Sequence, residues 1–281
     1  MRNMKKSINT NSIPYLFLTI IHIGLFSFLL KRKNNTHAWI LFLSNVGFAF
    51  LFEYPTLNLF HGYRYKPSIM KKRFFDVILG AILSQAVYVP ISATFLTLFK
   101  KNWKWKMCLS IMYVGIEKLF IHLKIYKVFW WKPIFTPFLI FIYFHISDLF
   151  FKALSNQNKW ALKTAHFLSV EVLFIMLLYL VAAKRQIRFG IGMYHTSTEH
   201  FKIVPLYSLI LSSLATFTSS KSGAIYRFLM IFCHIFIDVF LVKKGLLKVN
   251  FKRRLNYICW YLTMIFISKF LYKTIYHSND F

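Results

Sequence analysis

The sequence predicts an all-α, polytopic transmembrane helix bundle with eight or nine spans. The first observation is composition: 57% of the 281 residues are hydrophobic, whereas soluble globular proteins contain roughly 45–50%. The second is that these residues form continuous runs of about the length, roughly 17–25 residues, that a helix needs to cross a bilayer. The third is that short basic segments separate the runs, and none is long enough to fold as a soluble domain.

The predicted spans form one integral membrane domain over residues 1–281. Continuous apolar runs favour helices, because the strands of a membrane barrel would alternate apolar and polar residues. The first run is interpreted as a retained anchor, since basic residues 31–33 follow it where a signal peptide would have small residues. The fourth run contains Glu117 and Lys118 and has a re-entrant segment as its alternative, which would leave eight spans. In chain order the spans cover residues 13–30, 37–53, 75–99, 107–123, 133–151, 165–183, 203–219, 224–242 and 255–272.

Basic residues dominate the connections, with 36 Lys and Arg against 8 Asp and Glu in the chain and a formal net charge of +28. The amino terminus and the even-numbered connections hold more Lys and Arg than the odd-numbered ones, which predicts a cytoplasmic amino terminus. Trp103, Trp105 and Trp160 stand beside lysines at span ends, as expected at a membrane interface. Membrane lipids with anionic headgroups are therefore the expected partners of the basic loops. Nucleic acid is not an expected partner, because no domain presents the charges on one face.

The acidic residues are the most informative part of the sequence, because all but Glu199 and Asp280 lie inside or at the edge of a predicted span. A charged side chain at the bilayer centre costs about 2.5–3.5 kcal/mol on insertion scales. A chain that places its few carboxylates there is expected to use them, in packing or in chemistry. The main predicted cluster of intramembrane polar residues is Glu117, His145, Asp148, Glu171, Arg227, His234 and Asp238. The second predicted polar layer is Glu53, Asp76 and Gln85.

Helical spacing supports two parts of the main cluster. Arg227, His234 and Asp238 are separated by seven and four residues, which places them on one face of a helix. His145 and Asp148 stand three residues apart, again on one face. In one interpretation each acid pairs with a polar group on a neighbouring helix and fixes how the bundle packs. In the other, these carboxylates and histidines line a proton or small-solute path, which suits histidine because it titrates near neutral pH.

The predicted function is therefore that of a non-enzymatic membrane component. The alternative is a membrane-embedded enzyme acting on a lipid or lipid-linked substrate, with Glu117, His145 or His234 as acid–base groups. Neither a metal nor a cofactor is expected: residues 195–200 lack the spacing of a metalloprotease motif, and no thiol completes a zinc site with His234. The three cysteines are isolated in apolar runs and are expected to be small core residues.

The first half of the chain contains several short polar and aromatic motifs. They are Glu53-Tyr54-Pro55, Tyr63 to Pro67, Phe75-Asp76, Glu117, Trp130 to Pro133 and Ser147-Asp148. Together they resemble uncharacterised small multi-spanning membrane proteins of endospore-forming bacteria. This resemblance implies a bacterial cytoplasmic membrane and no assigned activity, and it leaves a scaffold for sporulation or envelope assembly as a further alternative. An internal similarity between residues 74–76 and 253–256 is too weak to predict a duplication.

Overall fold

The computed structural model describes residues 9–33, 35–192, 195–221, 223–249 and 254–276, and gives the backbone alone for residues 224, 227 and 254–259. Its long helices match the predicted spans one for one, with α3, η3 and α4 forming a single span, and confirm the all-α fold class. The helices are α1 (Ile13–Arg32), α2 (Asn35–Glu53), α3 (Arg73–Ile82), α4 (Val89–Leu98), α5 (Trp103–His122), α6 (Phe135–Ser155), α7 (Lys159–Ala183), α8 (Ser197–Ser219), α9 (Ala224–Lys243) and α10 (Arg254–Tyr276). A short turn, η1 (Thr10–Ser12), precedes α1, and the π-helical segments are η2 (Tyr54–Leu59) and η3 (Leu83–Tyr88).

The chain is a multi-pass membrane protein by the length and apolarity of its helices. Among the described residues, six helical segments meet both conditions: Thr10–Arg32, Asn35–Leu59, Arg73–Leu98, Phe135–Ser155, Lys159–Ala183 and Ser197–Ser219. Helices α5, α9 and α10 have similar lengths. On α9, the side chains of Ile225, Phe228, Phe232 and Phe236 follow helical spacing and are all exposed. Such an apolar stripe is suited to contact with lipid tails rather than water.

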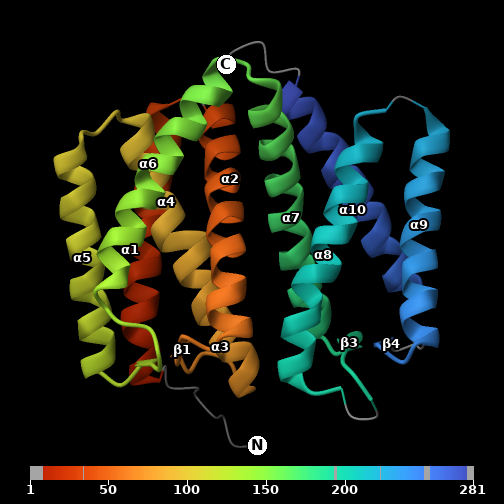
Figure 1. Cartoon of the computed structure of the whole chain (residues 1–281), viewed down its shortest axis with the longest axis horizontal. Helices are drawn as coiled ribbons and strands as arrows, with labels where there is room; N and C mark the ends of the chain where they lie inside the picture. Colours follow the sequence, from red (N-terminus) through yellow and green to blue (C-terminus); the bar gives the residue numbers. More distant parts are fainter. Residues whose placement is uncertain (1–8, 34, 193–194, 222, 250–253, 277–281) are drawn as a thin grey trace, which may run out of the picture. The chain divides into compact units, whose positions relative to one another are not determined.

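Figure 1 labels these helices along the chain, and by their contacts they divide into two compact units. The first unit comprises Met1–Ala38 and Pro55–Leu149, and the second comprises Trp39–Tyr54 and Phe150–Phe281. Within the first, α1 packs against η3 and α4; within the second, α7 packs against α8 and α10, and α8 also contacts α9. The single membrane domain expected from the sequence stays a prediction.

The described chain contains the same order of elements twice: helix, strand, helix, helix, strand, helix. The first repeat runs from α2 to α6 and the second from α7 to α10. The strands are β1 (Tyr63–Tyr65), β2 (Tyr126–Val128), β3 (Ile187–Phe189) and β4 (Leu247–Val249). β1 pairs antiparallel with β2, and β3 with β4, in matching registers. We call these the first and second strand pairs. They were absent from the sequence prediction, because three residues are too few to show an alternating pattern.

The same helix-ending turn leads into three of the four strands. At the ends of α5, α7 and α9 the backbone takes a positive φ at Lys124 (58°), Arg185 (57°) and Gly245 (70°), two residues before the strand. The next amide then donates to a carbonyl five residues back, as for Ile125 to Phe120 at 3.0 Å. This bond is the signature of the Schellman motif, which satisfies carbonyl groups that the last helical turn leaves unpaired. The turn therefore reverses the chain compactly from a long helix into a short strand.

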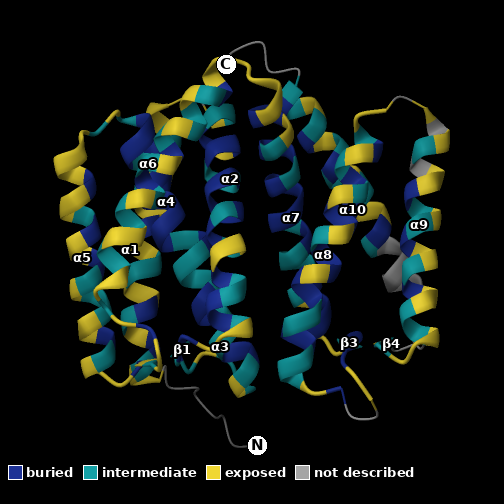
Figure 2. Ribbon diagram, viewed as in Figure 1, coloured by how far each residue is buried: buried dark blue, intermediate teal, exposed yellow. Residues whose placement is uncertain are grey.

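Each strand pair buries one face against its own unit. The buried side chains are Tyr63, Tyr65 and Tyr126 in the first pair and Ile187, Phe189 and Leu247 in the second. The side chains between them in sequence lie on the other face, as the period of two in a strand requires. Gly80 of α3 allows the first pair to approach closely, since a Cβ there would lie 2.4 Å from the Tyr65 Cβ. Figure 2 shows buried positions in dark blue and exposed positions in yellow along the helices.

Candidate functional site

In the first unit, Asp148 of α6 lies at the centre of a polar group that joins three helices. Lys106 of α5 is buried and forms an ion pair with Asp148. Thr97 of α4 donates to Asp148 Oδ1 at 2.6 Å, and its hydroxyl also lies 2.9 Å from that of Ser147. Lys106 Nζ lies 3.4 Å from His145 Nδ1. The structure therefore brings the predicted residues His145 and Asp148 together, around a lysine that the sequence prediction placed in a connection.

Glu117 of α5 lies apart from that group, nearer the other end of the same helix. Thr136 of α6 donates a hydrogen bond to Glu117 Oε2 at 2.5 Å. The indole nitrogen of Trp131 in turn donates to the Thr136 hydroxyl at 3.2 Å. Glu117 therefore joins α5 to α6 through a chain of neutral donors rather than through a base.

In the second unit, Glu171 of α7 is buried against two serines of α8. Ser208 and Ser212 donate to the same carboxylate oxygen, at 3.0 and 2.6 Å. The two serines stand four residues apart and therefore share one face of α8. Glu171 therefore links α7 to α8 through two hydroxyl donors.

Asp238 of α9 is also buried, and two tyrosines hold its two oxygens. Tyr207 of α8 donates to Oδ1 at 2.6 Å, and Tyr261 of α10 donates to Oδ2. Asp238 thereby connects three helices of the second unit. His234, one turn earlier on α9, is fully buried, and its ring centroid lies 5.1 Å from that of Tyr261. Neither ring nitrogen of His234 has a hydrogen-bond partner within the described part of the chain.

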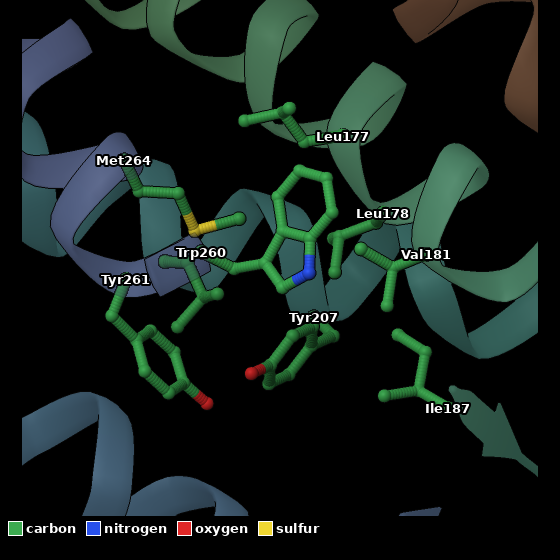
Figure 3. A pocket seen from close by; sticks show the side chains of 9 residues that line it. Leu177, Leu178, Val181, Ile187, Tyr207, Trp260, Tyr261 and Met264 are labelled. Atoms are coloured by element: carbon green, nitrogen blue, oxygen red, sulfur yellow. The ribbon is translucent and has the colours of Figure 1, made fainter. Parts of the chain in front are cut away.

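A small pocket adjoins the two tyrosines (Figure 3). Tyr207 and Tyr261 contribute to its wall, and their hydroxyl groups are turned toward each other. The rest of the lining is largely apolar and includes Trp260 and Met264. The space open to the centre of a water molecule is about 20 Å³, and a water needs roughly 10–15 Å³ by that measure. The pocket is therefore about the size of one water, but its lining is almost entirely apolar and offers a water few hydrogen-bond partners.

Asp76, a member of the predicted second layer, stabilises a loop. Its two oxygens accept the backbone N–H groups of Ser68, Ile69 and Met70, each at 2.8 Å. These bonds hold the segment that connects β1 to α3. A structural role of this kind is sufficient to account for a carboxylate at the start of a span.

The other predicted residues lie in different places. Gln85 lies half-buried in η3 of the first unit, and Glu53 is buried at the end of α2 in the second. The side chain of Arg227 lies outside the described residues. Within the second unit, Glu171 and Asp238 accept from consecutive α8 residues, Ser208 and Tyr207. A common cavity for the main cluster stays a prediction, since its members are divided between the two units.

The two repeats have polar side chains at equivalent positions. Glu117 stands nine residues before β2, and Asp238 nine residues before β4. Ser147 of α6 lies 2.9 Å from the Thr97 hydroxyl, and Ser268 of α10 donates to the Ser219 hydroxyl at 3.1 Å. Both bonds join the last helix of a repeat to the carboxyl end of its second span.

The sequence predicted the buried carboxylates but not the side chains that donate hydrogen bonds to them. Tyr207, Tyr261 and Thr97 lie within apolar runs, where the sequence gives no sign of their partners. One expectation about cysteine was wrong: Cys108 is exposed on α5 rather than part of a core. No protein-family model, curated protein or solved structure matches the chain, and the roles of these residues are therefore argued from their geometry.

Proposed function

We propose that this chain is a non-enzymatic, multi-pass component of a bacterial cytoplasmic membrane whose buried carboxylates tie its helices together. One observation carries this proposal: Glu117, Asp148, Glu171 and Asp238 each accept hydrogen bonds from side chains of a neighbouring helix. Interhelical polar contacts within membranes contribute about 0.6 kcal/mol on average, and at most about 1.7. They are modest in energy, but they specify which helix faces pack together.

A double-mutant cycle between Glu171 and Ser212 tests this role. Glu171→Ala, Ser212→Ala and the double variant would be unfolded from mixed micelles by a denaturing detergent and compared with wild type. We expect a coupling free energy of about 0.6–1.7 kcal/mol. Ser213→Ala, which alters an exposed neighbour whose hydroxyl bonds its own helix at Leu209, is the matched control. A coupling energy of zero would contradict the proposal.

The proposed topology has nine crossings with a cytoplasmic amino terminus. All four strand-bearing connections would then lie on the cytoplasmic side, because each follows an even number of crossings. These connections contain the basic pairs Lys184-Arg185 and Lys243-Lys244, in agreement with the excess of Lys and Arg found in cytoplasmic loops. Four spans separate equivalent points of the two repeats, and both repeats would therefore cross the membrane in the same orientation.

A second candidate function is a proton or small-solute path through the second unit. The observation that favours it is His234, which is buried without a hydrogen-bond partner in the described chain and lies one turn from Asp238. Both residues contact Tyr261, which also borders the water-sized pocket. Histidines and carboxylates buried in membrane helices mark proton relays in pumps and transporters. Asp238 and His234 are the groups that would exchange the proton.

Proton flux into proteoliposomes tests this second candidate. The full chain would be reconstituted, a potassium diffusion potential imposed, and internal pH followed with a trapped dye. We expect wild-type flux above that of protein-free liposomes, and its loss in Asp238→Asn. Glu199→Gln, which removes a half-buried carboxylate that caps the start of α8, is expected to retain the flux. Wild-type vesicles no leakier than empty ones would exclude the path and leave the packing role standing.

Two further interpretations are distinguished by deletion of the gene. A membrane-embedded enzyme acting on a lipid predicts a changed lipid profile in the deletion strain. The resemblance to membrane proteins of endospore formers stays a prediction, and with it the role of a scaffold in sporulation or envelope assembly. A scaffold predicts an unchanged lipid profile together with a defect in that process.

A further inference from the structure

The outward faces of the two strand pairs present like charges directly opposite each other. In the first pair, the register places Arg64 across from Lys127. In the second, it places Arg188 across from Lys248. Residues directly opposite in an antiparallel pair project to the same face, with Cβ atoms about 4.5–5.5 Å apart. Each unit therefore places an exposed lysine and a half-buried arginine side by side on a two-stranded support.

This arrangement is unfavourable without a counterion. Like charges directly opposite on neighbouring strands destabilise a sheet. The inner faces of the two pairs differ, with Tyr63 and Tyr65 in one where Ile187 and Phe189 stand in the other. The outer faces agree, because each pair places an arginine opposite a lysine. An anion bound between the two cations would relieve their repulsion.

The described contacts of Arg64, Lys127 and Arg188 involve no carboxylate. Arg64 and Lys127 lie over the ring of Phe129, at 5.5 and 5.1 Å from its centroid. Arg188 donates to the hydroxyl of Ser197 at 2.8 Å. Within the described residues, none of these three cations forms an ion pair. These contacts orient Arg64, Lys127 and Arg188 and leave those three charges available to an external anion.

We propose that each strand pair binds one phosphate-bearing anion between its arginine and its lysine. Arginine offers a planar fork of donors that matches two phosphate oxygens, and lysine adds a compact charge beside it. The first pair is followed two residues later by the half-exposed Trp130, an aromatic residue of the kind enriched at membrane interfaces. A phospholipid headgroup and a free phosphate share the required chemistry, and the experiment separates them.

Thermal unfolding of the detergent-solubilised full chain provides the test. Melting temperature would be measured against rising concentrations of short-chain phosphatidylglycerol, phosphatidylcholine or inorganic phosphate. The variants are R64Q/K127Q for the first pair and R188Q/K248Q for the second. The charge-matched control is K104Q/K163Q, which neutralises exposed lysines near the starts of α5 and α7, away from the strands that follow those helices.

We expect the anion to raise the melting temperature of wild type and of the control alike. In each strand-pair variant, the affinity for the anion at the altered pair should fall about 30-fold. This is the loss expected when two basic residues near an anionic surface are neutralised. Without anion, each strand-pair variant should melt at or above the wild-type temperature, because the repulsion has been removed. Stabilisation by phosphatidylglycerol alone identifies a lipid headgroup, and equal stabilisation by inorganic phosphate identifies a free anion.

Three results would overturn the proposal. The first is unchanged anion binding in both strand-pair variants. The second is an equal loss of binding in the K104Q/K163Q control, which would assign the effect to overall charge. The third is a lower melting temperature of the strand-pair variants in the absence of anion, which would make the pairs structural. All the variants leave Glu171 and Asp238 intact, and the outcome is therefore independent of the packing and flux experiments.

Discussion

Replacing Gly80 by alanine probes how closely the first strand pair packs against α3. The added Cβ would lie 2.4 Å from the Tyr65 Cβ, 2.9 Å from its Cγ and 3.3 Å from the Pro67 Cδ. The nearest atom belongs to the base of the tyrosine side chain, which moves only with the strand. The substitution therefore forces β1 away from α3 or distorts the helix.

The expected cost follows from two opposing terms. Inserting a methyl group into a close-packed contact costs about 1–3 kcal/mol, and an approach of 2.4 Å belongs at the upper end. Alanine gains about 1 kcal/mol over glycine in helix propensity. The net destabilisation of Gly80→Ala is therefore about 2 kcal/mol. Gly115→Ala in α5 is the matched control, since no atom lies within 4 Å of its added Cβ, and it should be neutral or stabilising by up to about 1 kcal/mol.

Reversible unfolding by denaturing detergent in mixed micelles, followed by circular dichroism, measures both variants. We expect the unfolding midpoint of Gly80→Ala to fall well below that of Gly115→Ala. Equal midpoints for the two variants would show that the first strand pair does not pack closely against α3.

Four other substitutions test separate contacts. Asp76→Ala removes the acceptor of three backbone N–H groups and should lower the free energy of unfolding by about 3 kcal/mol. Hydrogen exchange at residues 68–70 should become faster, and exchange that stays slow would contradict this role. Lys106→Gln breaks the pair with Asp148, whose side chain is 37% exposed, and should cost about 1–2 kcal/mol in detergent unfolding rather than the roughly 3–5 of a fully buried pair. Lys104→Gln, the neighbouring control, should cost almost nothing, and equal losses would argue against the pair. Ser147→Ala and Ser268→Ala should each cost about 0.6 kcal/mol, and a large difference between their unfolding midpoints would weaken the equivalence of the repeats.

The helices were predictable because long apolar runs leave little choice of structure in a bilayer. The runs predicted at 13–30 and 224–242 correspond to Ile13–Arg32 and Ala224–Lys243. The strands were not predictable, since each has three residues and lies in a basic connection. Their placement depends on helix-ending turns, which the sequence marks with glycine only at Gly245 and with Lys124 and Arg185 elsewhere.

The candidate site was predictable in its acids and not in their partners. Burying a carboxylate is costly enough that its position alone is informative. The donor depends on how neighbouring helices are rotated, and Tyr207 in an apolar run reveals nothing about that. The repeat was also not visible in the sequence. The weak similarity between residues 74–76 and 253–256 pairs positions that are not equivalent in the two repeats. The residue equivalent to Asp76, which stands eleven residues after β1, is His200, which stands eleven residues after β3.

The most direct measurement of the topology is the sidedness of the two strand pairs. Cys108, Cys233 and Cys259 would be replaced by serine, and single cysteines introduced by Lys127→Cys, Lys248→Cys, Lys104→Cys and Lys221→Cys. Intact cells would then be treated with a membrane-impermeant maleimide. The account predicts labelling at positions 104 and 221 in intact cells, and at 127 and 248 only after permeabilisation. Labelling of 127 and 248 from opposite faces would contradict two repeats that cross the membrane in the same orientation.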